Sequence, residues 1–406
     1  SSISSPMLED LGEKNMGDPE TLKDFIIWAI QNYPADHYLL VIWDHGGGWK
    51  GVCQDDFSGK DVLTMHELSN ALNQAYIETG EKLDIIGFDA CLMGMLEVGY
   101  QIKDYSNYMI ASEDEIPAEG WDYDDFLDDL INNPEMEAPE LCELIISTYV
   151  DESAYINDRT LSAPELNLIN SVASAVSNLA DLLYNDLDNS EYENIIEECR
   201  ENSKEYQYNN HHDYIDLYEF AQNVQSSSLP EPTKEAANAV LISINNCIGG
   251  REGHGILNRG HGLSIYFPKN FYYSSYDFLR FSEDYHWDEF LQKYEKGMET
   301  PPVISNVQAV PISQVAGGWV NITCEVTDNI AVDTVKVNIT CPVGCNFNAT
   351  MNNIPGTNIY YYNSTYSIVG TWQFFIWAND TSGNANSSDT HTFIISYPMS
   401  FNLSLL

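Results

Sequence analysis

The chain has 406 residues, which is too long for one compact domain and suits two or three. Its 62 Asp and Glu against 17 Lys and Arg give a formal net charge of −45, which argues against nucleic acid and anionic membranes as partners because both bind basic faces. Adaptation to salt and attraction of cationic partners explain this acidity equally well. No run of about eighteen apolar residues occurs, so we expect no membrane span.

The first 300 residues alternate between apolar runs and segments of helical spacing. Four short apolar runs predict strands, at 37–44, 83–90, 107–112 and 262–268. Three segments with apolar residues three or four positions apart predict helices, at 21–33, 64–80 and 93–102. Short apolar strands separated by helices are typical of a mostly parallel sheet covered on both faces. Residues 136–247 have an almost wholly helical pattern, which predicts a helical layer or insertion before the last strand.

The composition changes near residues 297–303. Beyond them the chain has five acidic residues and one Lys among many Thr, Asn, Val and Tyr, and its apolar residues alternate at period two. This pattern predicts an antiparallel β-sandwich of roughly 100 residues. We therefore expect two domains, an α/β domain at 1–299 and an all-β domain at 300–406.

The predicted β-sandwich carries all seven N-x-S/T sequons of the chain, at Asn321, Asn338, Asn348, Asn363, Asn379, Asn386 and Asn402. Asn-rich composition produces some sequons by chance, but their confinement to one domain favours an exported, glycosylated module. The eight cysteines are scattered without C-x-x-C pairs, which argues against a zinc framework. Cys324, Cys341 and Cys345 allow one disulfide, with one thiol left over.

Two residues with catalytic chemistry directly follow predicted strands. His45 lies in LVIWDHGGGW after the first strand, and Cys91 lies in GFDACLMG after the second. Because open α/β sheets place catalysts at the carboxyl ends of their strands, we expect both residues at one edge, where a thiolate attacks and an imidazole carries the proton. A helix starting near Leu92 would lower the pKa of the thiol. The N–H groups of Gly46 and Cys91 are candidates for an oxyanion hole.

Other readings of these and neighbouring residues compete. A single His at a strand end is usually a satisfied polar residue, and a single buried Cys is usually a small hydrophobe. Cys53, in a loop eight residues after His45, is a weaker nucleophile. The histidines of 211–220 and 253–262 are weak zinc candidates, since the adjacent pair in the first segment points apart on a helix. The acidic run 113–129 predicts a solvated helix start or a calcium site.

The motifs DHGGGW and FDACLMG, with NMGDPETLKDFIIWAIQNYPADHYLLVIW and GLSIYFP, closely resemble the clostripain family of cysteine peptidases over about residues 8–295. The resemblance implies the caspase-like α/β/α fold shared with gingipains and legumain, and a His–Cys dyad on His45 and Cys91. It implies hydrolysis after basic residues with no cofactor required, although some members depend on calcium. The family's first strand, before LGEKNMGD, is missing here, which indicates a cut or late-starting chain. The β-sandwich lies outside the family's core and resembles Ig-like modules of secreted and surface proteins.

The resemblance also assigns the pocket for the basic side chain to Asp89, two residues before Cys91. Residues i and i+2 of a strand share a face, so this carboxylate should lie roughly 7 Å behind the nucleophile. A guanidinium can meet it with two charge-assisted hydrogen bonds, so we expect Arg to be preferred over Lys. Alternatively, Asp89 caps the next helix or orients its loop. Glu119 and Asp122 are further candidates for the negative field of the pocket.

Members of the resembling family mature by cleavage just beyond the catalytic histidine. Here that region is the polar loop 50–64, and exposed loop tips are where proteases cut. We expect cleavage after Lys60 rather than Lys50, an uncut loop being the alternative. The leading prediction is a secreted or cell-surface endopeptidase acting on protein or peptide substrates. The rival is a catalytically silent surface adhesion or binding protein; the sequence makes no prediction of oligomeric state.

Overall fold

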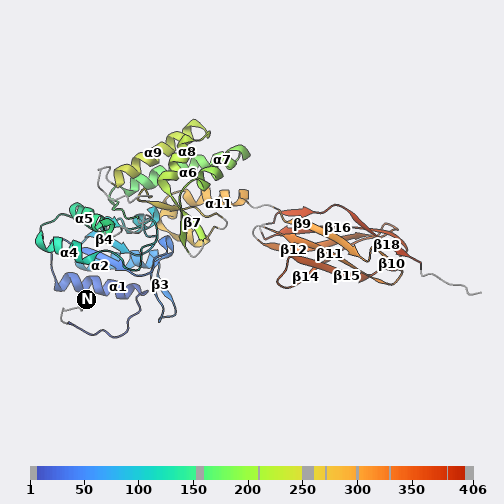
Figure 1. Cartoon of the computed structure of the whole chain (residues 1–406), viewed down its shortest axis with the longest axis horizontal. Coiled ribbons are helices and arrows are strands. Elements are labelled where there is room, and N and C mark those ends of the chain that lie inside the picture. Colours follow the sequence, from blue (N-terminus) through green and yellow to red (C-terminus); the bar gives the residue numbers. More distant parts are fainter. Residues whose placement is uncertain are drawn as a thin grey trace, which may run out of the picture. The chain divides into compact units, whose positions relative to one another are not determined.

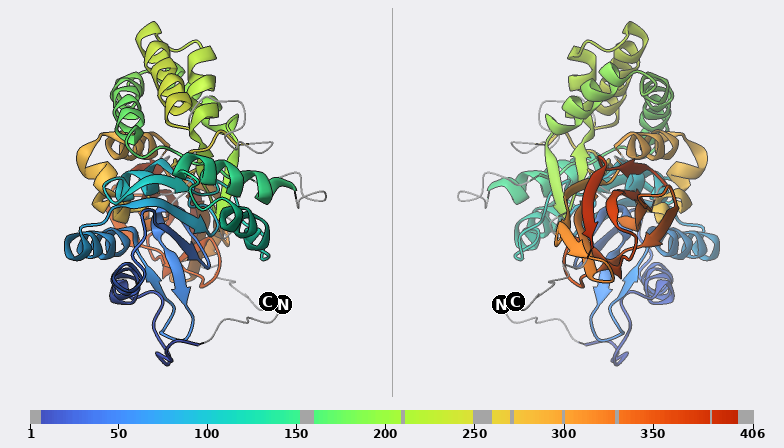
Figure 2. Two further views of the ribbon diagram at one scale, coloured as in Figure 1. Left: turned by 90° about the vertical axis from the view of Figure 1, so that its left-hand side faces the viewer. Right: turned by 90° about the vertical axis from the view of Figure 1, so that its right-hand side faces the viewer.

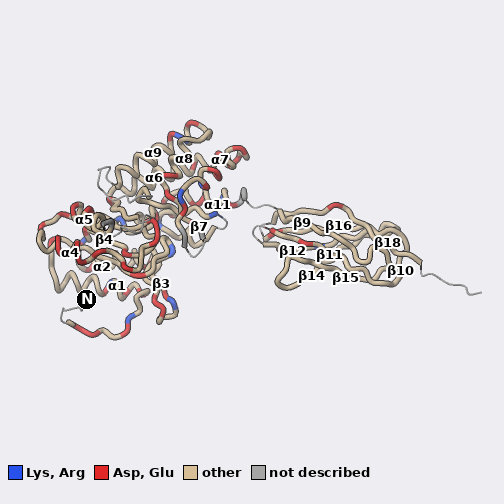
Figure 3. Tube along the Cα trace, in the orientation of Figure 1, with Lys and Arg blue, Asp and Glu red and all other residues tan. Residues whose placement is uncertain are grey.

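The computed structural model describes residues 7–151, 160–208, 211–248, 260–269, 272–298, 301–328, 331–381 and 383–397. The chain forms two compact units, Ser1–Tyr294 and Glu295–Leu406, which divide close to the boundary expected at 299–300 (Figure 1). Asp and Glu are spread over the first unit and are scarce in the second (Figure 3). Within the described ranges, no helix is both long and apolar enough to cross a membrane.

A parallel sheet of three strands lies at the centre of the first unit. Its strands, in spatial order, are β1 (Leu39–Trp43), β4 (Leu83–Asp89) and β5 (Ser106–Ile110). These are the first three apolar runs of the sequence, and both pairs of neighbouring strands are parallel. The last residues of β1 and β4 lie opposite each other, Trp43 beside Asp89. The sheet therefore brings the segments that follow β1 and β4 to one edge.

Helices cover both faces of this sheet. Figure 2 shows α1 (Pro19–Asn32) and α2 (Met65–Thr79) on one side and α4 (Tyr123–Asn132) and α5 (Ala138–Asp151) on the other. Thr64 and Glu67 cap α2 with reciprocal hydrogen bonds, as the T-x-x-E pattern predicts, and Gly80 ends it at a φ of 74°. The face towards α4 and α5 buries Ile85 and Ile110 against the aromatic side chains of those helices. The helices α1 and α2 thus form where the spacing of apolar residues predicts them.

The region 136–247, expected to be almost wholly helical, is interrupted by two strands. Besides α5 it contains four helices, α6 (Ile169–Asp186), α7 (Ser190–Glu201), α8 (Leu217–Ser226) and α9 (Glu231–Cys247). Between α7 and α8 lie β6 (Glu205–Tyr208) and β7 (His211–Asp216). The sequence pattern did not reveal β6 and β7, because the spacing of the buried Tyr206 and Tyr214 fits the period of a helix as well as that of a strand. The expected helical layer is thus present, but the two strands within it were not predicted.

The last predicted strand does not extend the parallel sheet. It forms β8 (Ser264–Tyr266), which pairs antiparallel with β7 in a sheet of order β6-β7-β8. One parallel bridge joins Ser264 to Met95, and the Ser264 amide donates to the Gly94 carbonyl oxygen at 2.8 Å. In α3 (Leu96–Ile102) the buried Glu97 accepts hydrogen bonds from the Tyr266 amide and the Tyr276 hydroxyl. Both contacts fasten the segment after Cys91 to β8.

Four short elements complete the first unit besides the hairpin described below. They are η1 (Gly48–Lys50), η2 (Ser274–Phe278), α10 (Arg280–Asp284) and α11 (Trp287–Met298). Trp287 is buried and donates from its indole nitrogen to the Tyr266 carbonyl oxygen at 2.7 Å. Aromatic rings of β8, η2 and α11 therefore share one core beside the Cys91 segment.

The second unit consists of two β-sheets around a shared core. One sheet has the order β10-β18-β16-β12-β13 with β17 beside β16, and the other has the order β14-β15-β11-β9. Their bounds are β9 (Val303–Val310), β10 (Ser313–Val315), β11 (Trp319–Thr327), β12 (Val332–Thr340), β13 (Asn346–Thr350), β14 (Asn352–Asn353), β15 (Ile359–Thr365), β16 (Gly370–Asp380), β17 (Ala385–Ser387) and β18 (His391–Ser396). Alternate residues of β11 and β16 are buried between the sheets. The pairs are antiparallel except β10 with β18.

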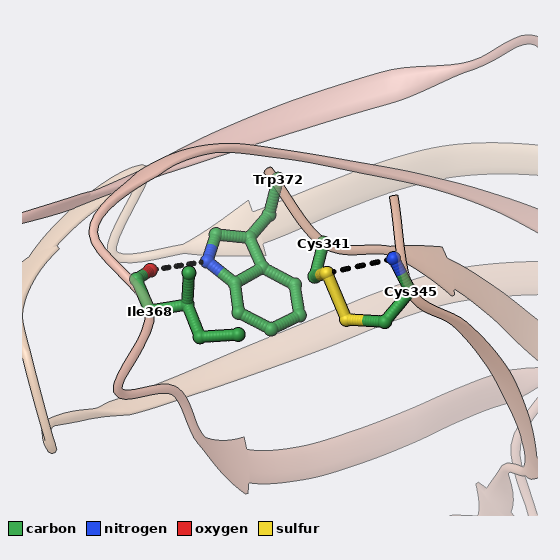
Figure 4. Close-up of a disulfide and its surroundings, with 4 residues drawn as sticks. All are labelled: Cys341, Cys345, Ile368 and Trp372. Atoms are coloured by element: carbon green, nitrogen blue, oxygen red, sulfur yellow. Dashed lines mark hydrogen bonds between the residues drawn. A yellow bond between two sulfur atoms is a disulfide. The ribbon is translucent and has the colours of Figure 1, made fainter. Parts of the chain in front are cut away.

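One of the three cysteine pairings allowed in this unit is formed. Cys341 and Cys345 make a disulfide, and the Cys345 amide nitrogen lies 2.9 Å from the Cys341 sulfur (Figure 4). Cys324 remains a free, buried thiol. Beside the disulfide, the Trp372 indole nitrogen donates to the carbonyl oxygen of Ile368. The expected count of one disulfide and one remaining thiol agrees with this arrangement.

Candidate active site

His45 and Cys91 are brought together by the pairing of β1 with β4. Each lies two residues beyond the matched pair Trp43 and Asp89 at the carboxyl ends of these strands. A Cβ atom on Gly46 would overlap the carbonyl oxygen of Cys91 and lie 3.0 Å from its amide nitrogen. Any side chain larger than that of glycine would therefore push the two main chains apart. The exposed His45 directly precedes this contact.

The amide of Gly46 is directed away from its hairpin partner. Gly46 and Val52 form an isolated antiparallel bridge, whose two hydrogen bonds run from Cys53 to the His45 carbonyl and from Gly47 to the Gly51 carbonyl. In such a pair the residues directly opposite each other do not bond to one another, so their own N–H groups point outward. The Gly46 N–H has no acceptor among the described residues. That leaves the Gly46 N–H free to donate to a substrate.

The next glycines serve the packing of the same turn. Gly48 has a φ of 63°, and a Cβ on it would overlap the Met95 sulfur. The Tyr214 hydroxyl of β7 donates to the Gly47 carbonyl oxygen at 2.6 Å. Trp49 is buried among the aromatic rings of Tyr266 and Tyr276. The glycines that follow His45 therefore let this turn pack closely against the segment 91–95 and against Tyr214.

Cys91 differs from the other free thiols in its exposure. The chain has six free cysteines, all in its described part; five are buried, and Cys91 alone is partly exposed. Its sulfur accepts a hydrogen bond from the Ile116 amide at 3.3 Å, and lies 3.7 Å from the Ile116 carbonyl oxygen. Cys91 is thus the thiol best placed to meet a substrate.

The expected helix does not begin at Cys91. Leu92 has a φ of 66°, and its amide donates to the Asp114 carbonyl oxygen, while the Gly94 amide donates to Ser112. Because these amides bind the neighbouring loop, α3 starts only at Leu96. Burial raises the pKa of the Cys91 thiol; the Ile116 amide opposes this, and Glu115 and Asp114 add to the rise. The prediction of a thiol pKa lowered by a helix end is therefore wrong, and ionisation needs a base.

Cys53 does not fit the role of nucleophile. It lies in β2 (Val52–Asp55) with 7% of its surface exposed. Burial, with a smaller effect of Asp44, raises the pKa of its thiol to about 12. The preference for Cys91 over Cys53 agrees with both observations.

Asp89 is buried behind Cys91 and has one oxygen without a partner. The side chain is 2% exposed, and its Oδ2 accepts hydrogen bonds from the Trp121 amide at 3.2 Å and the Tyr123 hydroxyl at 2.9 Å. Its Oδ1 is buried and has no hydrogen-bond partner among the described residues. Burial raises the pKa of Asp89, and the two donors oppose that rise. Asp89 does not cap α3, whose N-cap is Met95.

The other acidic candidates lie differently. Asp122 is the N-cap of α4 and accepts from the Asp125 amide at 3.3 Å, while Glu119 is exposed. Gly120 packs directly against Asp89, so the turn containing Glu119 covers that carboxylate. Among the described residues, the run 113–129 does not bring three carboxylates within ligand distance of one another. It begins α4, as the helix-start reading predicts, and calcium binding stays a prediction.

The loop expected around Lys60 is a hairpin. Residues Val52–Asp55 (β2) pair antiparallel with β3 (Asp61–Leu63), so the expectation of a strand-free loop is wrong. Short runs of three or four residues carry too little periodicity to be recognised. Lys60 is exposed at the tip with a φ of 63°. Lys50 is half-buried beside Asp213 and the Tyr273 ring, which leaves Lys60 the more accessible cleavage site.

Several contacts at this site were missed by sequence reasoning. Ile116 holds the thiol through its main chain, which no side-chain pattern can reveal. Trp121 and Tyr123 bind Asp89 from a loop more than thirty residues away. In the sequence, the only sign of this contact is the aromatic pair Trp121 and Tyr123 in GWDY, and the same pattern also fits the start of a helix. Of the histidines considered for zinc, those at 211, 212 and 254 lie outside the residues whose side chains are described, whereas His261 is described and lies beside Asp216.

Comparison with known proteins shows the family of the chain. Residues 6–294 match the clostripain family of peptidases, and the chain belongs to that family. Clostripain of Hathewaya histolytica is 28% identical over 308 residues, which cover 63% of this chain and 58% of that protein. The chain thus spans less than two thirds of the length of this relative. A secreted C11 cysteine protease from Bacteroides thetaiotaomicron, solved with an irreversible peptide inhibitor, shares its fold at a TM-score of 0.51, with 24% identity over 68% of this chain and 80% of that one.

The raised thiol pKa makes a testable prediction for alkylation by iodoacetamide. At neutral pH little of Cys91 is thiolate on its own, so removal of the base in His45→Ala should slow its alkylation at least about tenfold. As the pH rises towards the thiol pKa, more thiolate forms without a base, and the two rates should converge. Mass spectrometry of the Cys91 peptide gives the rates.

The exposed His66 of α2 supplies the matched control, and His66→Ala should alkylate like the unaltered chain. Equal rates for the unaltered chain and His45→Ala at pH 7 would contradict the pairing of His45 with Cys91.

Proposed function

We propose that the chain is a cysteine endopeptidase with Cys91 as nucleophile and His45 as proton carrier. The observation that carries this proposal is the contact of Gly46 with the Cys91 main chain, which brings the loop of His45 next to Cys91. Among the free cysteines of the described residues, Cys91 is the one that is not buried. Membership of the clostripain family supports it. A silent adhesion protein would have no need to keep this contact.

The proposed reaction passes through a thioester. His45 accepts the thiol proton, and the Cys91 sulfur attacks the carbonyl carbon of the scissile peptide bond, whose π electrons move to oxygen. The N–H groups of Gly46 and Cys91 donate to this oxyanion. When the C–N bond breaks, the imidazolium returns its proton to the leaving amine. Water, deprotonated by His45, then attacks the thioester, the C–S bond breaks, and the thiol recovers its proton.

We further propose that Asp89 selects a basic side chain before the scissile bond. Its Oδ1 is buried without a partner among the described residues, whereas Oδ2 is held by Trp121 and Tyr123. A buried carboxylate oxygen without a partner is costly, and a guanidinium supplies the missing charge-assisted hydrogen bonds. Lysine brings a single point charge, so Arg is preferred. Because Gly120 covers Asp89, the entering side chain has to displace the turn that contains Glu119.

An exported location is proposed from the second unit. Asn348, Asn363 and Asn386 are exposed sequons on its strands, whereas Asn402 lies outside the described residues. A disulfide in the same unit supports an oxidising compartment. We propose that this unit is an Ig-like module of a secreted or cell-surface peptidase that acts on proteins or peptides.

The dyad is tested by activity against arginyl peptides. Cys91→Ala should abolish cleavage, and His45→Ala should lower kcat by at least about a thousandfold, because a nucleophile and its proton carrier act as a unit. Cys53→Ala is the control and should retain activity, since that thiol is buried. Full activity of Cys91→Ala would end the proposal.

Specificity is tested with matched peptides that differ only in the residue before the scissile bond. Asp89→Asn should cost Arg peptides about 2–3 kcal/mol, or roughly thirty- to a hundred-and-fifty-fold in kcat/KM, because the charge that meets the guanidinium is lost. Neither Asp nor Asn peptides should be cleaved by the unaltered chain. Asp84→Asn, at the other end of β4, controls for a change of charge in the same strand.

Asp89→Asn should change the alkylation rate of Cys91 much less than it changes kcat/KM for Arg peptides. Equal turnover of Arg and Asn peptides by the unaltered chain would refute the assignment of Asp89.

Self-processing after Lys60 is the last part of the proposal. Lys60 is exposed at a hairpin tip, so N-terminal sequencing of active protein should find a new end at Asp61. Both Lys60→Gln and Cys91→Ala should stay intact, whereas Lys50→Gln should be cut normally. An intact chain with full activity would refute processing without affecting the dyad.

A further inference from the structure

A second group of reactive side chains lies where β7 meets α8. Asp216 is fully buried and caps α8 by accepting from the Glu219 amide at 2.9 Å. His261, from the segment before β8, directs its Nδ1 at Asp216 Oδ2, 3.0 Å away. One ligand atom from each of Asp216, Glu219 and His261 lies within 4.8 Å of the other two. These residues come from the two segments considered for zinc; His261 is one of the histidines considered there, whereas Asp216 and Glu219 were not named.

A buried carboxylate faces the same place from the loop after β5. Glu113 is 1% exposed, and its Oε2 accepts from the Gly262 amide, next to His261, at 2.8 Å. Its Oε1 is buried and has no hydrogen-bond partner among the described residues. A Cβ on Gly260 would overlap Glu113 Oε2 and lie 3.2 Å from the Tyr206 hydroxyl, which in turn lies 3.4 Å from Asp216 Oδ2. Glu113 and Asp216 are therefore both neighbours of the Tyr206 hydroxyl.

We propose that Asp216, Glu219 and His261 bind a divalent transition-metal ion, with zinc as the representative ion. One imidazole nitrogen with two carboxylate oxygens suits zinc, whereas calcium and magnesium prefer oxygen alone. The His261 side chain is 35% exposed while Asp216 is fully buried, so the site is anchored on one side and open on the other. Three protein ligands and an open position form a common zinc arrangement.

Neighbouring groups already orient these ligands. The Tyr218 ring stacks on the His261 imidazole with centroids 4.6 Å apart, and the Lys204 amide donates to Glu219 Oε2 at 2.7 Å. Such partners fix the direction of metal ligands in known sites. The Lys204 ammonium lies 3.3 Å from the Asp114 carboxylate. The ion would tie the end of β7 and the first turn of α8 to the segment that precedes β8.

Zinc binding by the full-length chain tests this site independently of peptidase activity. The measurements use a Cys91→Ala background, because the partly exposed thiol would itself bind zinc. Isothermal titration with Zn²⁺ should find about one tight site per chain, and Glu219→Gln and His261→Gln should each weaken it at least about tenfold. Glu235→Gln, an exposed residue of α9, is the matched control and should bind as the background does.

Location and specificity complete the test. Zinc-edge anomalous scattering from soaked crystals should show a peak between Asp216, Glu219 and His261, and excess Ca²⁺ should not displace it. Thermal unfolding of each variant without metal shows whether that variant is folded. If only one of Glu219→Gln and His261→Gln is folded, the zinc affinity of that variant decides the test. Equal zinc affinity in the variants and the control, weak binding spread over the acidic surface, or displacement by Ca²⁺ would overturn the proposal.

Discussion

The parallel pairing of β1 with β4 is the constraint on which the candidate site depends. This register puts Trp43 beside Asp89, and the chain then has only two residues on each side in which to place His45 and Cys91. The contact of Gly46 with the Cys91 main chain follows directly, and a Cβ would break it. Catalytic geometry at the edge of a sheet is therefore a consequence of backbone packing, with the side chains added to it.

The segment after β5 binds both Cys91 and Asp89. Ile116 donates to the Cys91 sulfur, and Trp121 and Tyr123 donate to Asp89. The carboxylates of Glu115 and Asp114 raise the thiol pKa from the same loop. The main chain that holds the Cys91 sulfur and the side chains that hold Asp89 therefore belong to adjoining segments, so a movement of one segment is expected to disturb the other.

The sequence predicted the three strands of the parallel sheet, and His45 and Cys91 just beyond two of them, because apolar runs and the motifs that follow them are local signals. It missed β6 and β7, where Tyr206 and Tyr214 fit helix and strand alike, and the hairpin that carries Lys60, whose strands are too short to show a period. It also misplaced the start of α3, because the amides of Leu92 and Gly94 bind a loop distant in sequence. Contacts of this kind depend on tertiary packing and leave no periodic trace.

The most direct test is a crystal structure of the full chain after reaction with a peptide that ends in arginine and carries a thiol-reactive ketone. The account predicts a covalent bond to the Cys91 sulfur, the ketone oxygen within hydrogen-bond distance of the Gly46 amide, and the guanidinium at Asp89 Oδ1. Absence of an adduct, a bond to another cysteine, or a guanidinium directed away from Asp89 would contradict it.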